Sequence, residues 1–221
     1  PLHQALKALA TAQDSTLFMV LLGSFQALLH RYSHQRDLRV GVPIANRNRL
    51  ETENLIGFFV NTQVLKAEVD AQMLFSELLG QVKQQVLDAQ ANQDLPFEQL
   101  VDALQPERSL SHSPLFQVMY NHQSAARSPA GSQRLPQLVV ENLGWEDHSA
   151  AFDLSLDTFE SEEGLQAQLT YATDLFDAAS IARMAEHWRN LLDDIVADPQ
   201  RPIADLTLLG EAEQHQLLDA W

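Results

Sequence analysis

The sequence predicts an α/β fold, closest to an α+β arrangement in which a mixed β-sheet is flanked by helices. Short segments in which apolar and polar residues alternate predict strands, and longer segments with apolar residues three or four positions apart predict amphipathic helices. Both kinds of segment occur along the whole chain, and the clearest pair of strands comes late, as a hairpin. This mixture argues against a purely helical or a purely β fold.

The first third of the chain contains two predicted helices and two predicted strands. Residues 15–34 begin with a Ser-Thr pair that can cap a helix, and apolar residues at helical spacing follow. Residues 38–42 and 60–65 alternate as strands do, and the polar residues 46–54 between them predict a loop. Residues 75–89 have the apolar repeat of an amphipathic helix.

A further helix is expected to begin near Asp94. The carboxylate of Asp94 can accept hydrogen bonds from the first amides of this helix. Pro96 is tolerated in the first turn, and Glu98 suits the positive end of the helix dipole.

The second half of the chain predicts three strands and a long helix. Residues 115–120 form a strand, and residues 151–159 and 165–171 form a hairpin joined by a polar turn. Residues 177–196 form a long amphipathic helix, and residues 201–221 form a short irregular stretch followed by a small helix. The expected core positions of the long helix are Ile181, Met184, Trp188, Leu191, Leu192 and Ile195.

The composition limits the function classes. The 221 residues are 45% hydrophobic, but no apolar run approaches the roughly 20 residues that span a bilayer, so no membrane partner is expected. The first residues do not form a secretion signal, and the cytoplasm is the expected location. Because the chain has no cysteine, disulfides, zinc–thiolate sites and a cysteine nucleophile are excluded.

The charge is strongly acidic and uneven. With 30 acids against 14 bases, a broad nucleic-acid-binding surface is not expected. Residues 141–221 hold 18 of the acids and 3 of the bases. This part predicts a solvated acidic surface, with a docking face for a basic partner as the alternative.

The residues alone reveal no catalytic centre. The sequence contains no Gly-x-Ser-x-Gly motif, no phosphate-binding glycine loop and no dinucleotide fingerprint. No metal site is expected. The histidines are scattered. Three of them are expected in or near loops, with no carboxylate spaced to orient them: His112, His122 and His148. On this evidence the chain is a globular mixed domain.

Three segments resemble the sequence motifs of condensation domains of non-ribosomal peptide synthetases. Residues 56–63 resemble the motif IGxFVNT, residues 92–98 resemble (H/N)QDxPFE, and residues 108–118 resemble RxxSxxPLFQV. The motifs stand in the family's order and spacing. Shorter similarities extend the resemblance over nearly the whole chain.

The resemblance implies a particular architecture. Condensation domains consist of two chloramphenicol-acetyltransferase-like halves around a tunnel, and one half carries a His-His-x-x-x-Asp-Gly motif. That motif assists the attack of an acceptor amine on a donor thioester. This chain contains no His-His pair, and its motifs are those of the other half. The resemblance therefore implies a C-terminal subdomain at residues 1–205, without catalytic residues and inactive alone, followed at residues 206–221 by the start of a linker to an adenylation domain.

The resemblance also implies partners and substrates. The partners are the N-terminal half of the domain, the upstream and downstream peptidyl carrier domains and the adjacent adenylation domain. The carriers deliver both substrates on 4'-phosphopantetheine arms, so no directly bound cofactor is expected. The product of the complete domain is an amide bond between aminoacyl or peptidyl groups.

By resemblance, the loop between Gly41 and Val60 is a floor that crosses toward the missing half, and a stretch from about Val118 to Val140 holds an arm that latches onto it. The implied tunnel or floor-loop residues are Arg47, Arg49, Gly57, Phe59 and Asn61.

Several roles at these positions stay open. The Asn61 amide either lines the tunnel or bonds to the loop backbone. Arg47 and Arg49 either bind a pantetheine phosphate or form a plain surface pair, and Gly57 is expected to supply backbone freedom for the turn.

The other motif residues are expected to be structural. They are Asp94, Pro96, Glu98, Arg108, Ser113 and Asp153. Asp153 lies among apolar neighbours, and a buried salt bridge to an arginine is the expected role of its carboxylate.

Two other functions remain open. An epimerisation domain shares the fold, but it carries a Gly-Trp-Phe-Thr type sequence where this chain has residues 57–62. The second alternative is a non-catalytic scaffold that docks carrier proteins.

Overall fold

In a computed structural model of the chain, described here for residues 1–47, 50–106, 113–124, 149–161 and 164–220, the strands form one mixed sheet in the order β2-β1-β3-β4-β5. The β1–β2 and β4–β5 pairs are antiparallel, and β3 is parallel to both β1 and β4. The strands are β1 (Asp37–Ile44), β2 (Asn61–Glu68), β3 (Val118–Gln123), β4 (Leu154–Ser161) and β5 (Gly164–Tyr171). The predicted class, a mixed sheet flanked by helices, is confirmed.

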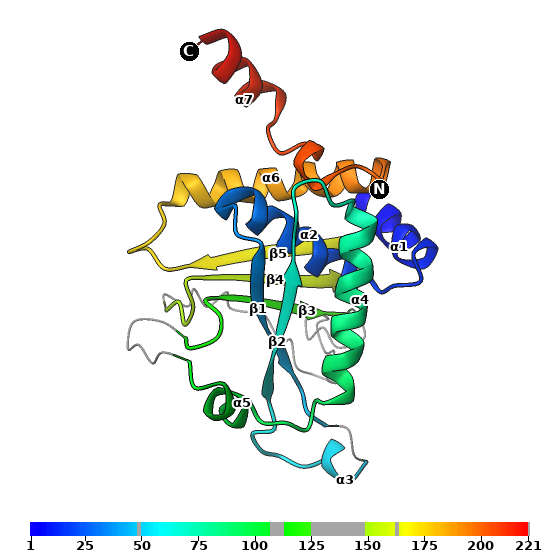
Figure 1. Cartoon of the computed structure of the whole chain (residues 1–221), viewed down its shortest axis with the longest axis vertical. Helices are drawn as coiled ribbons and strands as arrows, with labels where there is room; N and C mark the ends of the chain where they lie inside the picture. The colour runs from blue at the N-terminus through cyan, green and yellow to red at the C-terminus, as the bar shows by residue number, and fades with distance from the viewer. Residues whose placement is uncertain (48–49, 107–112, 125–148, 162–163, 221) are drawn as a thin grey trace, which may run out of the picture.

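The helices pack around this sheet, with α2 at the centre of the helical layer (Figure 1). One hydrophobic core joins α1, α2, α4 and α6 to the sheet, and alternate residues of β4 point into it. The α-helices are α1 (Leu2–Ala12), α2 (Leu17–Ser33), α3 (Leu50–Glu53), α4 (Phe75–Ala91), α5 (Phe97–Leu104), α6 (Ala178–Ala197) and α7 (Glu211–His215). A short 3₁₀ helix, η2 (Ile203–Asp205), and a short π-helix, η3 (Gln216–Ala220), complete the set.

Local sequence explains where the main helices begin. The Thr16 hydroxyl accepts a hydrogen bond from the Met19 amide at 3.2 Å and caps α2. The Asp177 carboxylate accepts one from the Ser180 amide at 2.8 Å and caps α6. All the predicted core positions of α6 are buried. In the described part of the chain, no single helix is long and apolar enough to cross a membrane, and α1 and α2 pass that test only jointly, as a pair bent by 102°.

Several elements differ from the sequence prediction, and strand β4 begins at Leu154 rather than at residue 151. Helix α1 was not predicted. No capping side chain marks its start, and of its residues only Leu6, Leu9 and Ala10 are buried. Helix α3 interrupts the predicted loop at residues 46–54. Strand β3 begins at Val118 rather than at residue 115, because the buried residues that precede it pack as an aromatic cluster instead of joining the sheet.

That cluster is centred on Phe116, whose ring lies against the backbone of Gly41 in β1. A Cβ atom added at Gly41 would lie 2.3 Å from Cε2 of Phe116. The Phe116 ring also contacts Phe97 of α5, with centroids 5.7 Å apart, and Phe152, with centroids 5.4 Å apart. The missing side chain at position 41 therefore makes room for the ring that connects β1, α5 and the start of β4.

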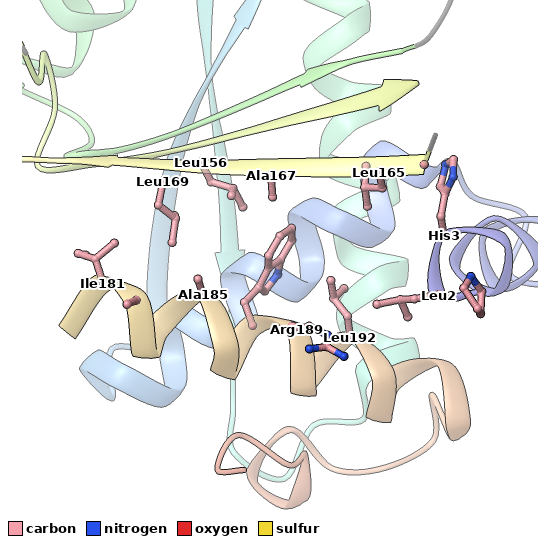
Figure 2. A pocket seen from close by; sticks show the side chains of 14 residues that line it. Leu2, His3, Leu156, Leu165, Ala167, Leu169, Ile181, Ala185, Arg189 and Leu192 are labelled. Atoms are coloured by element: carbon pink, nitrogen blue, oxygen red, sulfur yellow. The ribbon is translucent and has the colours of Figure 1, made fainter. Parts of the chain in front are cut away.

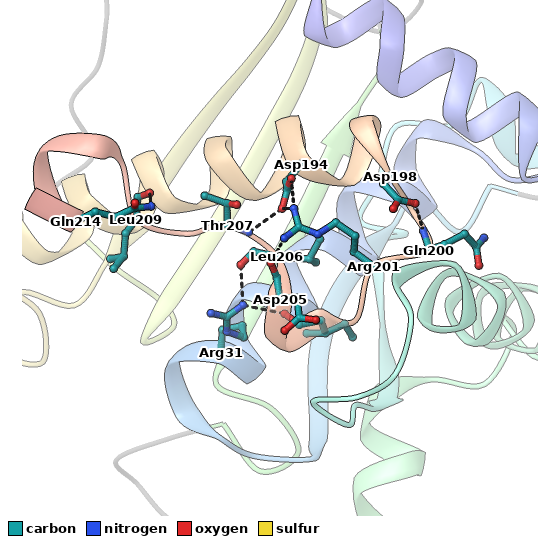
Figure 3. Close-up of polar contacts among 11 residues, drawn as sticks. Arg31, Asp194, Asp198, Gln200, Arg201, Asp205, Leu206, Thr207, Leu209 and Gln214 are labelled. Atoms are coloured by element: carbon teal, nitrogen blue, oxygen red, sulfur yellow. Dashed lines mark hydrogen bonds and ion pairs between the residues drawn. The ribbon is translucent and has the colours of Figure 1, made fainter. Parts of the chain in front are cut away.

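After α6 the chain turns back along the helix and is held by two arginines (Figure 3). Arg31 donates to the carbonyl oxygens of Ile203 and Leu206, both at 2.8 Å. Arg201 pairs with Asp194, whose carboxylate also accepts the Thr207 amide at 2.8 Å. Leu206 is buried, so the packed body includes residues beyond 205. Helix α7 then projects away from the body (Figure 1).

Candidate functional site

The loop between β1 and β2 is organised around Arg47. Its guanidinium donates to the carbonyl oxygens of Thr52, Leu55 and Gly57, the last two at 2.8 and 3.3 Å. It also lies 4.3 Å from the centroid of the Phe59 ring, a cation–π contact. Arg47 therefore braces its own loop, which places its charge against backbone oxygens and an aromatic face. Arg49 lies outside the described residues.

Gly57 has a different role from the one expected. Among the described glycines only Gly164 has a positive φ, so Gly57 does not need the backbone freedom of glycine. A Cβ atom at Gly57 would lie 3.1 Å from Cε2 of Phe59. The expectation of a glycine-dependent turn is therefore wrong, and the position instead keeps space beside the Phe59 ring.

The braced loop presents apolar side chains to solvent. Ile56 and Phe58 are 105% and 90% exposed. We call this surface the floor-loop face, and its residues are Leu50, Leu55, Ile56, Phe58 and Val60. Exposed apolar side chains gathered on one loop are typical of interaction surfaces.

Asn61, the first residue of β2, binds the start of α5 through both atoms of its amide. Its Oδ1 accepts the Phe97 amide at 3.0 Å, and its Nδ2 donates to the carbonyl oxygens of Leu95 and Gln93 at 2.8 and 3.3 Å. The segment that resembles IGxFVNT is thus joined to the segment that resembles (H/N)QDxPFE. Of the two roles left open for Asn61, the bonds to loop backbone are the ones present in this geometry.

The start of α5 differs in detail from the prediction. The helix begins at Phe97, and Pro96 is the N-cap residue rather than a member of the first turn. The amide of Phe97 is capped from β2 by Asn61, whereas the sequence predicts Asp94 as the cap. Glu98 lies in the first turn as expected.

The remaining motif residues lie near the Phe116 cluster. The carbonyl of Ser113 accepts a hydrogen bond from the Gln117 side chain at 3.1 Å, and Arg108 lies outside the described residues. Asp153 precedes β4, is half-buried, and donates its amide to the carbonyl of Gln117 at 3.1 Å. Within the described ranges no lysine or arginine pairs with its carboxylate, so the predicted buried salt bridge is not found.

A cavity of about 520 Å³ opens at the root of the floor loop. The ends of β1 and β3 and the residue before β2 line it, with apolar side chains on one wall and polar ones on the other. Its lining residues are Pro43, Ile44, Ala45, Val60, Asn121, His122, Gln123 and Ser124. The cavity therefore borders the segment that leads into the floor-loop face.

His122 belongs to a polar network that the sequence does not predict. Its Nε2 lies 3.3 Å from Glu160 and its Nδ1 lies 2.9 Å from the Thr158 hydroxyl. Glu160 also binds Lys7 of α1 at 2.5 Å and His3 at 3.3 Å. The expectation that no carboxylate orients His122 is therefore wrong. Because both ring nitrogens have partners, His122 is not a free base.

The network predicts acid-sensitive stability. Burial lowers the pKa of His122, against the opposing charge of Glu160. Burial raises the pKa of Glu160, but hydrogen bonds from Lys7 and His3 outweigh it and hold this pKa below its usual value. Both pKa values are lower in the folded chain, so the unfolded chain binds more protons as the pH falls. The contribution of each group to the free energy of unfolding is therefore complete above its unfolded pKa and is lost as the pH drops through the lower, folded pKa.

We therefore expect the melting temperature to decline as the pH falls below about 6.5, through His122, and again below about 4.3, through Glu160. Thermal unfolding between pH 8 and pH 4 measures both. The matched variant His122→Gln keeps hydrogen-bonding groups without a titrating ring, and it should lose the first decline. An unchanged melting temperature between pH 7 and pH 5 in the wild-type chain would contradict this assignment.

A separate apolar pocket of about 510 Å³ lies between β5 and α6, with α1 at one end (Figure 2). Leu165 and Leu169 of β5 face Ile181 and Ala185 of α6 across it. None of the motif residues lines this pocket. It is therefore not part of the site around the floor loop.

Comparison with known proteins gives matches over nearly the whole chain. A family model described as "Condensation domain" matches residues 1–218. A linear gramicidin synthase of Brevibacillus parabrevis is 49% identical over 219 residues, which are 98% of this chain and 3% of that protein. The chain thus spans a small part of this curated relative.

Solved structures agree in fold. A holo-AB3403 four-domain nonribosomal peptide synthetase, bound to AMP and glycine, superposes with a TM-score of 0.86 at 26% identity, over 96% of this chain and 17% of that chain. The X-domain from teicoplanin biosynthesis superposes with a TM-score of 0.84 at 27% identity, over 94% of this chain and 47% of that chain. The chain spans about half of the X-domain.

Proposed function

This chain belongs to the condensation-domain family of non-ribosomal peptide synthetases, and from that membership we propose that it is the C-terminal half of an amide-forming condensation domain. The observation that carries the proposal is the floor-loop face. Its loop is braced by Arg47, yet Ile56 and Phe58 are almost fully exposed. A preformed apolar surface of this kind suits a partner that covers it, and the N-terminal half is that partner.

Other observations support the assignment to one half. The chain aligns with 47% of the X-domain chain, as one of two similar halves would. The three motif segments all belong to the family's second half, and the sequence contains no His-His pair. Described residues of the three motifs are also in contact, because Asn61 of the first binds Phe97 of the second and Phe97 packs on Phe116 of the third.

In the complete domain the acceptor amine attacks the carbonyl carbon of the donor thioester. The new C–N bond forms, the C–S bond breaks, and the donor's pantetheine sulfur leaves as a thiol. The histidine pair of the other half handles the proton of the attacking amine, while this half supplies the floor and one wall of the tunnel. Upstream and downstream carrier domains deliver both substrates on 4'-phosphopantetheine arms.

We place the body of this half at residues 1–209 rather than 1–205. Leu206 is buried, and Asn190 of α6 donates to the carbonyl of Leu208 at 2.8 Å. Helix α7, which projects from the body, then begins the linker toward an adenylation domain (Figure 1).

The purified chain alone is expected to form no dipeptide from two loaded carrier proteins, because acid–base assistance requires a positioned group that this half lacks. The complete domain, assayed with the same carriers, should form the dipeptide. Product is measured by mass spectrometry after release from the acceptor carrier. Turnover by the chain alone above the uncatalysed rate would overturn the proposal.

A further inference from the structure

Asn121 of β3 and Asp157 of β4 form a polar pair on the face of the sheet opposite the buried Tyr120. The two residues are direct neighbours in the parallel ladder, and Asn121 Nδ2 donates to Asp157 Oδ1 at 3.0 Å. Tyr120 next to Asn121 is buried among helix side chains, and its ring stacks on Phe18 of α2. Since side chains alternate along a strand, Asn121 points to the other face.

The carboxylate dictates the orientation of the amide. The Oδ1 atom of Asp157 accepts the hydrogen bond, so Asn121 turns its NH₂ group toward it. This leaves the Oδ1 atom of Asn121 directed away from Asp157. Within the described ranges the Asn121 side chain bonds to Asp157 alone, since the Thr158 hydroxyl donates to the backbone carbonyl of Asn121 and not to Oδ1. Asn121 also lines the cavity at the root of the floor loop. A neutral, oriented acceptor atom is thereby available at the cavity wall.

We propose that the Asn121 carbonyl oxygen accepts a hydrogen bond from the attacking amine of the acceptor substrate, and that Asp157 is the positioning residue that holds the Asn121 amide in this orientation. The inference rests on the proposed function, because the floor loop brings the cavity to the junction of the two halves. One N–H of the amine donates to Asn121 Oδ1, and the nitrogen lone pair stays free to attack the thioester carbonyl carbon.

The neutrality of the amide has a chemical consequence. An amine attacks only in its unprotonated form, and a free α-amino group has a pKa of about 7.7–8.0. A carboxylate at the same place would favour the ammonium form by opposite charge. An amide oxygen binds the amine without stabilising its ammonium form. The Asp157 carboxylate bonds to the Asn121 amide and not to the amine itself.

The first test is Asn121→Ala in the complete domain, assayed for dipeptide formation with varied concentrations of loaded acceptor carrier. The loss of one neutral hydrogen bond should lower kcat/KM for the acceptor about 3- to 10-fold. Ser155→Ala, on the same face of β4, is the matched control and should leave the rate unchanged. Melting temperatures of both variants, measured on the same preparations, separate a loss of fold from a loss of binding.

The second test exchanges the pair, with Asn121→Asp and Asp157→Asn in one variant. The cross-strand hydrogen bond is preserved, so the melting temperature should match the wild type. The cavity now receives a carboxylate oxygen, so the pH at which the rate is half-maximal should rise by about 1 unit. A purely structural pair would leave this pH profile unmoved.

The outcomes discriminate between the two proposals. If the wild-type complete domain forms no amide bond, the proposed function fails. If it is active and Asn121→Ala keeps the wild-type kcat/KM per folded molecule, or the exchanged variant keeps the wild-type pH profile, the role of Asn121 is overturned and the proposed function stands. A lowered kcat/KM together with a shifted pH profile supports Asn121 as the amine-binding group.

Discussion

Gly41→Ala is expected to destabilise the chain by about 1–3 kcal/mol, because the new methyl group enters a filled core. The added Cβ would lie 2.3 Å from Cε2 and 2.5 Å from Cζ of Phe116. The ring cannot move aside freely, since Phe97 and Phe152 pack against it. Thermal unfolding should show a melting temperature lower by about 2–4 °C for each kcal/mol.

Gly80→Ala is the matched control for this substitution. Gly80 lies on the exposed face of α4, and a Cβ atom there meets nothing within 4 Å. Alanine should therefore stabilise the helix by about 0.5–1 kcal/mol. Phe116→Leu added to Gly41→Ala should cost less than the sum of the two single changes, as expected for residues in contact. Equal melting temperatures for Gly41→Ala and the wild type would contradict the packing described for this strand.

Asn61→Ala is expected to remove the attachment of α5 to the sheet. The substitution leaves the Phe97 amide without its acceptor and the carbonyl oxygens of Leu95 and Gln93 without their donor. Loss of such bonds costs about 1–3 kcal/mol. The melting temperature should fall, and the amide hydrogens at the start of α5 should exchange faster with solvent.

Asn61→Asp distinguishes the contribution of the Asn61 Oδ1 acceptor from that of the Nδ2 donor. The carboxylate still accepts the Phe97 amide, but it has no hydrogens for the two carbonyl oxygens and faces them with negative charge. We expect the Phe97 amide to stay protected from hydrogen exchange, while the amides of the preceding residues 93–95 exchange faster. If Asn61→Ala instead keeps the wild-type melting temperature and slows condensation in the complete domain, the tunnel-lining role of Asn61 is correct and the structural one is wrong. A stable variant with an unchanged rate contradicts both.

The elements that the sequence predicts well are those whose own residues mark both the type of the element and the place where it begins. Helices α2 and α6 combine a capping side chain with an apolar repeat, and β4 and β5 alternate on either side of a turn. Helix α1 lacks a cap, so its pattern does not mark a beginning. Strand β3 is misplaced by three residues because Leu115 and Phe116 are buried for a reason other than sheet formation.

The site was predictable as a set of motifs but not as a set of contacts. Asn61 and Phe97 are 36 residues apart and meet only because β2 begins where α5 starts. His122 reaches Glu160 through the parallel register of β3 and β4, which no spacing along the chain reveals. The bracing by Arg47 is local, yet it depends on the turn at Asn46, whose φ is 50°.

We propose that this chain works as one half of a condensation domain and requires the other half. The most direct measurement is dipeptide formation from two loaded carrier proteins with the purified chain, with the separately produced N-terminal half, and with the two mixed. We expect product only in the mixture, at a rate that rises with the concentration of either half. Product from this chain alone, or no product from halves that bind each other while the intact domain is active, would contradict it.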